Sequence, residues 1–462
     1  MDSFLRALLL LSFTTAFTAC GGSSSGTTDR SPSTSATNVS SASRSLSSHS
    51  LSSFSTNSRS ISSHSLITSS SGAFSSPPSS ASSTSTTAMC GTYNLCPTDT
   101  SDWQFNSSEY CISKSFCPTS RTHLPIADYR QTLINEHANE ATKKVFQYLN
   151  SIYGKKTLSG QMDLTWDDDI DMATRVYTDT QKYPALMGYD FMNYGMTANW
   201  VEGLHQTQEA IDYWNAGGLI TFAWHWRDPS KLHTPEVNAA EFYTTAQQHT
   251  NFRIPVKENA LDVNASEYTQ INTGIDLIAE ELKALQDAGA VVLWRPLHEA
   301  AGGWFWWGAT RADNVPPAFA QILLWRHMYD RLTHHHGLNN LIWVWNGQDA
   351  LWYPGDDYVD ISSYDIYAAN YHSQIATFSR TQKFSFEKKM VALSETGRIP
   401  DPTLAFKDGA HWLWFMVWND TPTVGSNDNF WSVVNSLSHR QAVYQHEHII
   451  TREDLPNFII QK

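Results

Sequence analysis

Two glutamates stand at the ends of apolar runs, where a carboxyl group could do chemistry. One closes the run Val291-Val-Leu-Trp-Arg-Pro-Leu-His-Glu299, and the other lies in Met390-Val-Ala-Leu-Ser-Glu395-Thr-Gly. A charged group at the end of a buried strand is costly unless it is paired or functional. Glycoside hydrolysis needs two such groups, one to protonate the leaving oxygen and one, ionised, to attack the anomeric carbon in a retaining enzyme.

The surroundings of the two carboxyl groups predict different roles for them. A loop rich in tryptophan follows Glu299, so desolvation should raise the pKa of this glutamate and keep it protonated as the acid/base. Glu395 should stay ionised as the nucleophile if Arg295 and Tyr367 donate hydrogen bonds to it. A retaining enzyme would place the two carboxyl groups ~5–5.5 Å apart. The alternative is that both are structural carboxylates.

The elements that must position these groups are eight short apolar runs separated by helical patterns. The runs begin at Lys156, Ala185, Gly218, Ala290, Leu341, Val359, Met390 and Trp412. Helices are expected at residues 206–215, 274–288 and 317–333. Continuous apolar strands that alternate with helices predict a parallel sheet. Eight units over ~300 residues indicate the α/β class and a (β/α)8 TIM barrel. An open doubly wound sheet is the alternative, but no GxGxxG or P-loop follows any run.

Barrel enzymes keep their chemistry at the C-terminal ends of the strands, where strands four and seven lie roughly opposite each other. Glu299 and Glu395 can therefore face one another across the mouth. Other polar and aromatic residues share these positions: His225, Asp228, Arg295, His298, Asp365, Tyr367, Trp418 and Asn419. His298-Glu299 is not an HExxH zinc motif, because Gly302 stands where the second histidine should be. We expect neither a metal nor a cofactor.

Three segments resemble glycoside hydrolase family 26, chiefly its β-mannanases. They are Trp294-Arg-Pro-Leu-His-Glu299, Gly303-Trp304-Phe-Trp-Trp-Gly308 and Leu393-Ser-Glu395-Thr-Gly, and the resemblance covers about residues 136–456. It implies that Glu299 is the acid/base and Glu395 the nucleophile. The side chains expected to bind substrate are His225, Arg295, His298, Trp304, Tyr367 and Trp418. His225 could instead be a packed histidine and Trp418 a lid, and at least one tryptophan of the 304–307 loop should be core.

The expected function is that of a retaining endo-β-1,4-mannanase acting on mannan, galactomannan or glucomannan, with β-mannan and manno-oligosaccharides as its partners. One alternative is a family 26 enzyme for another β-glycan, such as β-1,3-xylan or mixed-linkage glucan. The other is a non-catalytic glycan-binding lipoprotein. The net charge of -14 argues against nucleic acid as a partner, because such proteins carry clusters of Lys and Arg. We expect a monomer.

Four cysteines cluster at residues 89–118, ahead of a cysteine-free body. They are Cys90, Cys96, Cys111 and Cys117. So short a unit cannot hold a useful hydrophobic core, so two disulfides are expected, with three pairings open. Zinc is the less favoured reading, because no CxxC pair occurs.

The aromatic residues of this module suggest a ligand. Tyr93, Trp103 and Phe105 could stack on pyranose rings, and the segment resembles the family 10 carbohydrate-binding modules. That resemblance implies cellulose or another plant cell-wall glycan as the ligand. The alternative is that the module is a disulfide-bonded structural cap or spacer.

The first 88 residues read as an export signal and a tether. Residues 1–20 combine Arg6, a short apolar run and small residues before Cys20, as a signal peptide does. Phe17-Thr-Ala-Cys20 resembles a lipobox, which would give a membrane contact only through a lipid anchor. The serine-rich residues 21–88 predict a disordered linker. The barrel is assigned to residues 124–462. We therefore expect an exported protein, either an outer-membrane lipoprotein or cell-surface protein of a bacterium, or otherwise a secreted one.

Overall fold

The computed structural model describes residues 89–98, 102–106, 108–118, 130–165, 170–198, 205–237, 241–244, 249–386, 389–420 and 429–458. The predicted signal peptide, Cys20 and the serine-rich linker lie outside the described residues, so these remain predictions. Within the described ranges, every helix is either too short or too polar to cross a bilayer.

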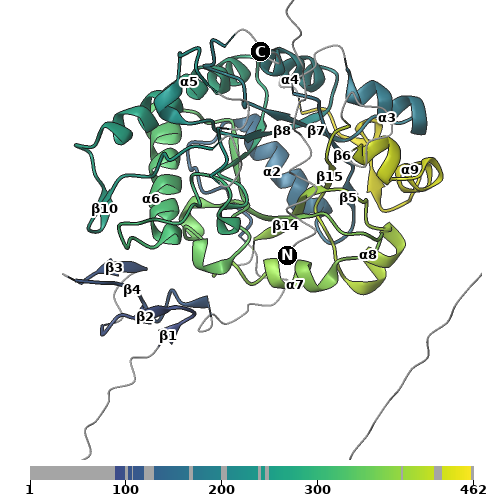
Figure 1. Cartoon of the computed structure of the whole chain (residues 1–462). Coiled ribbons are helices and arrows are strands. Elements are labelled where there is room, and N and C mark those ends of the chain that lie inside the picture. Colours follow the sequence, from purple (N-terminus) through teal and green to yellow (C-terminus); the bar gives the residue numbers. More distant parts are fainter. Residues whose placement is uncertain are drawn as a thin grey trace, which may run out of the picture. The chain divides into compact units, whose positions relative to one another are not determined.

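Eight parallel strands close into a barrel, which confirms the predicted fold (Figure 1). The strands are β6 (Gly160–Met162), β7 (Leu186–Asp190), β8 (Leu219–Trp224), β11 (Val292–Pro296), β12 (Leu341–Trp345), β13 (Ile361–Ile366), β14 (Met390–Thr396) and β15 (Phe415–Val417). Neighbours in the barrel follow the order of the chain, and β15 closes the ring by pairing Val417 with Gln161 of β6. Each of the eight apolar runs supplies one strand.

The first and last strands start later than the sequence suggests. Residues Thr157–Leu158 form a separate strand, β5, which pairs with β16 (Ile449–Ile450), so the barrel strand begins only at Gly160. A Cβ at Gly160 would lie 2.4 Å from the carbonyl oxygen of Phe415, so glycine allows this close approach. The eighth strand begins at Phe415 rather than at Trp412.

Helices surround the barrel and follow the expected alternation. They are α2 (Glu140–Ile152), α3 (Met172–Thr180), α4 (Gln206–Asn215), α5 (Ser266–Asp287), α6 (Pro317–Asp330), α7 (Ile375–Thr381), α8 (Pro402–Asp408) and α9 (Leu437–Tyr444). The bounds of α4 agree with the prediction. Helix α5 starts well before the expected residue 274. Helix α6 continues into a π-helical turn, Arg331–His335, and the chain then turns at Gly337, whose φ is +65°.

Shorter elements complete the described chain. A small hairpin consists of β9 (Val256–Lys257) and β10 (Ala260–Leu261). Single 3-10 turns occupy residues 229–231, 300–302, 350–352, 356–358 and 452–454, and a second π-helical turn covers 430–434.

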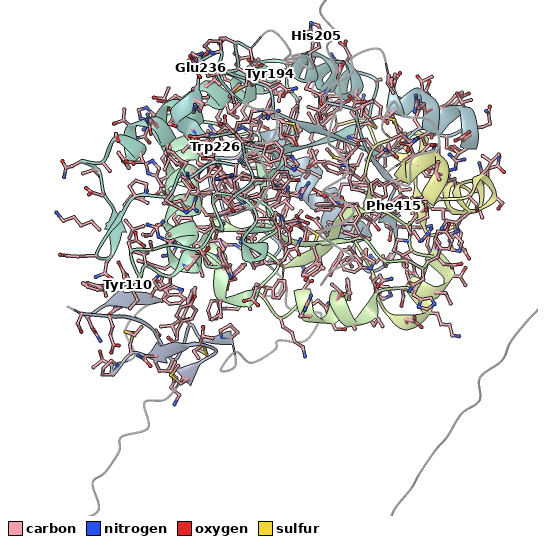
Figure 2. All side chains as sticks on the ribbon, in the orientation of Figure 1. Tyr110, Tyr194, His205, Trp226, Glu236 and Phe415 are labelled. Carbon is pink, nitrogen blue, oxygen red and sulfur yellow. A yellow bond between two sulfur atoms is a disulfide. The ribbon has the colours of Figure 1, made fainter. Side chains whose placement is uncertain are left out.

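Much of the high tryptophan content is used in the core. Ten of the 18 tryptophans are among the largest fully buried side chains, including Trp226, Trp294 and Trp343. Trp226 lies in the interior in Figure 2, whereas His205 and Glu236 lie at the surface. Trp304 and Trp418 are only partly buried, so they remain accessible at the mouth.

The four-cysteine module is a small sheet held by two disulfides. Its strands are β1 (Met89–Cys90), β2 (Tyr93–Leu95), β3 (Trp103–Phe105) and β4 (Tyr110–Ile112), in the order β1-β2-β4-β3. Cys90 pairs with Cys117 and Cys96 with Cys111. The disulfides are therefore nested, which settles the choice among the three possible pairings.

The module's aromatic side chains contact protein. Trp103 is only 3% exposed, meets the edge of Tyr93, and lies 6.2 Å from the ring of Phe319 on α6. Asp102 forms an ion pair with Arg326 of the same helix at 2.6 Å. The expectation that Trp103 offers a free ring to sugar is therefore wrong, because packing covers that ring. Tyr93 and Phe105 are partly buried.

Candidate active site

A left-handed turn after β11 aims Glu299 into the mouth of the barrel. Leu297 and Glu299 have φ values of 51° and 52°, which residues other than glycine rarely adopt. The backbone N–H of Glu299 donates to the carbonyl oxygen of Asn346 at 2.7 Å. Such conformations cost on the order of 1–3 kcal/mol each and persist where the surroundings hold them. Their concentration beside one carboxyl group marks the turn as a functional feature.

The carboxyl group of Glu299 receives two N–H donors. Trp304 donates from its indole to Oε2 at 3.0 Å, and Gln348 donates from its amide to Oε1 at 3.1 Å. Burial raises the pKa of Glu299 to about 7, and the negative charge of Glu395 adds to this effect. Glu299 therefore keeps a proton near neutral pH, which a general acid needs.

The carboxylate of Glu395 is held by the two donors that the sequence suggested. Arg295 donates to Oε1 at 2.6 Å, and the hydroxyl of Tyr367 donates to Oε2 at 2.7 Å. Arg295 also pairs with Asp365 at 3.3 Å. Burial alone would lower the pKa of Arg295, but the charges of Asp365 and Glu395 outweigh burial and raise it. The guanidinium therefore stays charged beside Glu395.

Three carboxyl groups converge at this point. Oxygen atoms of Glu299, Asp365 and Glu395 lie within 4.8 Å of one another. An inverting hydrolase leaves ~6.5–9.5 Å between its two carboxyl groups, and a retaining one ~5–5.5 Å. The short separation favours direct attack by a carboxylate over attack by an intervening water. Arg295 forms ion pairs with both Asp365 and Glu395, so its single positive charge compensates one negative charge of this cluster.

Two histidines lie beside the carboxyl cluster. Nε2 of His298 is 3.2 Å from Nε2 of His225, and the ring of His225 faces the edge of Trp418 with centroids 5.9 Å apart. Burial lowers the pKa of His298 well below its usual value, and His225 and Arg295 lower it further. His298 is therefore neutral. His225 is buried and contacts Asp190 and His298, as expected of a packed histidine, and its role in substrate binding stays a prediction.

The tryptophan loop divides between core and mouth. Trp306 and Trp307 are each 1% exposed and donate to the carbonyl oxygens of Trp226 and His298 at 2.6 and 2.8 Å. Trp304 alone of the three faces Glu299. This confirms that at least one ring of the loop is core.

Three further residues at the site were not among the predicted site residues. Asp190 closes β7 and contacts His225, so the strand-end signal that identified Glu395 could have identified it too. Gln348 follows β12 after two residues and has a φ of 65°. Tyr243 lies on a loop, and its ring stacks on Phe305. Burial raises the pKa of Tyr243, and the negative charges of Glu299 and Glu395 add to the rise.

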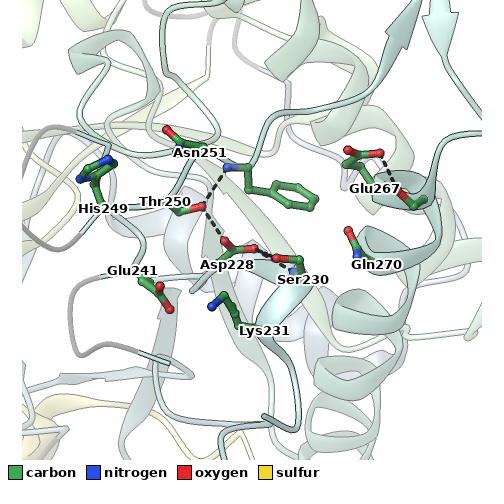
Figure 3. A pocket seen from close by; sticks show the side chains of 11 residues that line it. Asp228, Ser230, Lys231, Glu241, His249, Thr250, Asn251, Glu267 and Gln270 are labelled. Atoms are coloured by element: carbon green, nitrogen blue, oxygen red, sulfur yellow. Dashed lines mark hydrogen bonds between the residues drawn. The ribbon is translucent and has the colours of Figure 1, made fainter. Parts of the chain in front are cut away.

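A separate hollow of about 450 Å³ lies between the loop that follows β8 and the start of α5 (Figure 3). It contains neither Glu299 nor Glu395. Its Asp228 carboxylate is already engaged, since it accepts hydrogen bonds from the hydroxyls of Ser230 and Thr250 at 2.6 and 2.7 Å. The convergence of carboxyl groups is at the strand ends, and the candidate chemistry therefore belongs there.

A parallel barrel whose fourth and seventh strands bring two glutamates together is the architecture of a two-carboxylate glycoside hydrolase. Residues 134–454 match the model of glycosyl hydrolase family 26, and the chain belongs to this family. The resemblance inferred from the three sequence segments is thereby confirmed.

Named relatives agree with this assignment. The chain is 40% identical over 336 residues to a mannan endo-1,4-beta-mannosidase of Thermothelomyces thermophilus, covering 72% of this chain and 64% of the relative. It is 34% identical to mannan endo-1,4-beta-mannosidase B of a Piromyces species, covering 71% of this chain and 54% of the relative. The chain thus spans between half and two thirds of the length of these relatives.

A solved structure agrees as well. A β-mannanase from a symbiotic protist of the termite Reticulitermes speratus, complexed with a gluco-manno-oligosaccharide, is 32% identical with a TM-score of 0.61. The match covers 71% of this chain and 99% of that one.

Proposed function

We propose that this protein is a retaining endo-β-1,4-mannanase that hydrolyses β-mannan and manno-oligosaccharides. The observation that carries the proposal is the convergence of the Glu299 and Glu395 carboxyl groups within 4.8 Å at the mouth of the barrel. The names of the relatives and the gluco-manno-oligosaccharide in the termite-protist structure support the choice of mannan.

The reaction proceeds in two displacements. Glu395 Oε attacks the anomeric carbon, the C1–O bond to the leaving sugar breaks, and Glu299 gives its proton to the departing oxygen. Water then attacks C1 and gives a proton to Glu299, and the bond between C1 and Glu395 breaks. Each step inverts the anomeric centre, so the product keeps the configuration of the substrate.

Neighbouring groups support the two roles. The hydrogen bonds from Arg295 and Tyr367 stabilise ionised Glu395 before attack. The partly buried rings of Trp304 and Trp418 give the mouth aromatic walls on which sugars can stack.

Replacement of each glutamate with alanine, combined with azide as a small external nucleophile, tests the two roles. With an aryl manno-oligosaccharide, Glu299→Ala should accumulate glycosyl-enzyme that azide converts to a β-mannosyl azide. Glu395→Ala should give the α-azide, because azide then enters from the side that the glutamate vacates. Glu267→Ala, a change outside the cluster, serves as the control and should hydrolyse mannan at the wild-type rate. If both glutamate variants hydrolyse the substrate at the wild-type rate and give products of unchanged configuration, the assignment is wrong.

Substrate choice is tested separately. Reducing-sugar release from mannan, β-1,3-xylan and lichenan should be greatest on mannan. Faster release from xylan or lichenan would keep the catalytic pair but move the enzyme to another β-glycan. Binding of mannan without any turnover would support the glycan-capture alternative.

We further propose that the protein is exported and lipidated at Cys20, on the strength of the signal and lipobox-like residues. Labelled palmitate should be incorporated by cells that express the full chain, and Cys20→Ser should abolish the label. Label that survives in the variant would overturn this proposal.

A further inference from the structure

A row of buried groups leads from the end of β7 to the candidate nucleophile. The carboxylate of Asp190 accepts the backbone N–H of His225 at 3.0 Å through Oδ1, and its Oδ2 contacts Nδ1 of the same ring. Nε2 of His225 lies 3.2 Å from Nε2 of His298, which in turn lies 3.9 Å from Oε1 of Glu395. All four side chains are 8% exposed or less.

The carboxylate of Asp190, at one end of this row, determines which ring nitrogens of His225 and His298 carry hydrogen. An ionised carboxylate can only accept, so Nδ1 of His225 carries a hydrogen. The two facing Nε2 atoms then share a single hydrogen. Nδ1 of His298 is buried and has no hydrogen-bond partner among the described residues. A buried N–H without an acceptor is rarer and costlier than an unpaired lone pair. His298, being neutral, therefore carries its hydrogen on Nε2.

We propose that Asp190 is a positioning residue for Glu395: by fixing the hydrogen of His225 on Nδ1, it leaves Nε2 of His225 as the acceptor for the Nε2–H of His298, so that a hydrogen-bearing nitrogen of His298, rather than a bare one, lies 3.9 Å from Oε1 of Glu395. This inference rests on the proposed function, and it adds a third favourable dipole to the hydrogen bonds from Arg295 and Tyr367. Asp190 acts through the two imidazoles and does not itself reach the carboxyl cluster.

Replacing Asp190 with asparagine should move the hydrogen of each imidazole to the opposite ring nitrogen. The backbone N–H of His225 is fixed and needs an acceptor, so the amide oxygen must face it and the NH₂ group must face the ring. The ring then holds its hydrogen on Nε2, and His298 must move its own hydrogen to Nδ1. The nitrogen of His298 that lies 3.9 Å from Glu395 would then be bare instead of carrying a hydrogen, which removes a favourable interaction with the carboxylate.

Several other charged and titratable groups surround this row. Glu395 also lies beside Arg295, Tyr367, Asp365 and Glu299, and its charge acts on Tyr243. Arg227 interacts with the charge of Asp190. None of these residues changes in the variant, so a shift in the acid limb of the pH profile reports on the row.

The experiment compares Asp190→Asn with Asp360→Asn. Asp360 is similarly buried, at 3% exposure against 1% for Asp190, and accepts two backbone N–H groups, from Ile134 and Trp343, while no imidazole of the described residues donates to it. Loss of a tautomer-fixing aspartate costs up to ~10⁴-fold in a hydrolase whose histidine transfers the proton. His298 only orients Glu395, so a smaller fall in kcat, of about 10- to 100-fold, is expected here by the same comparison.

Two readouts separate this role from a structural one. In Asp190→Asn the acid limb of kcat/KM should move to higher pH with KM little changed, whereas Asp360→Asn should lower the Tm and leave that limb in place. Asp190→Glu should restore part of kcat, because it keeps the carboxylate. An unshifted acid limb in a folded Asp190→Asn enzyme would overturn the proposal.

Nitrogen-15 spectra of histidine-labelled protein test the same idea without activity. Wild-type His225 should show a protonated Nδ1, and His298 a protonated Nε2 with a bare Nδ1. A hydrogen on Nδ1 of His298 in the wild type contradicts the proposal even if the variant does not fold. If mannan is not hydrolysed by the wild type, the proposed function fails, while the spectra still decide whether Asp190 sets the tautomers.

Discussion

The mouth of the barrel and the four-cysteine module contain similar aromatic side chains, but these side chains face different neighbours. At the mouth, Trp304 points its N–H at Glu299 and keeps part of its ring accessible. In the module, Trp103 is buried between Tyr93 and Phe319 of α6. The comparison teaches that aromatic content alone does not identify a sugar-binding surface. What matters is whether packing leaves the face of the ring free.

The largest effect should come from the nucleophile at the mouth. Glu395→Ala removes the group that forms the covalent intermediate, and we expect kcat/KM on mannohexaose to fall by ~10⁴-fold or more. Steady-state kinetics give the loss, and circular dichroism checks that the barrel is intact. An intact variant that retains a tenth of the activity would contradict the role given to the mouth.

A second change at the mouth tests the acid. The pKa of Glu299 is raised to about 7, so the carboxyl group keeps its proton below that pH and loses it above. The basic limb of kcat/KM should therefore fall near pH 7. Trp304→Phe removes a donor that stabilises the ionised form, so the pKa should rise further and the limb should move to higher pH. A limb that moves downward, or not at all, would argue that Glu299 is not the acid.

In the module, the corresponding change should affect stability rather than catalysis. Trp103→Ala removes a buried ring, and by analogy with other large-to-small core changes it should destabilise the module by ~3–5 kcal/mol. Turnover of soluble manno-oligosaccharides should not change. Binding to insoluble mannan and cellulose, measured by pull-down with Tyr93→Ala as the matched variant, sharpens the comparison. Loss of binding in Tyr93→Ala with the fold intact would restore a sugar-binding role for the module.

The smallest expected effect distinguishes the two disulfides. Cys90–Cys117 spans 27 residues and Cys96–Cys111 spans 15. In the chain-entropy model the longer loop stabilises more, by about 0.5 kcal/mol. Double serine variants of each pair, compared by denaturant unfolding, measure this difference. If loss of the shorter bridge is the costlier, local packing rather than loop length governs the module.

The barrel could be predicted from sequence because each strand is a continuous buried run that ends in polar residues. The same signal located Glu299, Glu395, Arg295 and Tyr367, whose positions follow directly from strand ends. It did not fix the start of the first strand, since Thr157–Leu158 are as buried as barrel residues but pair with β16. Burial along a run does not reveal which partner the run has.

The rest of the site depends on contacts between distant segments. Tyr243 packs its ring on Phe305 from a loop, and Gln348 reaches Glu299 through a left-handed backbone that a sequence pattern does not specify. The burial of Trp103 depends on Phe319, more than two hundred residues away. The disulfide pairing likewise required the geometry of the folded module.

The unequal pairing of the barrel strands implies that the ring is held more weakly between β15 and β6 than between other neighbours such as β13 and β14. Strands β13 and β14 share six paired positions, whereas β15 and β6 share one. Outside the ring, β5, which precedes β6, pairs with β16, and its Leu158 also bridges to Trp414, just before β15. The pairing of β16 with β5 therefore helps to hold the first strand of the barrel in place. Shortening the chain before Ile449 should let the first strand detach, and amide exchange along Gly160–Met162 would accelerate before it did elsewhere in the barrel.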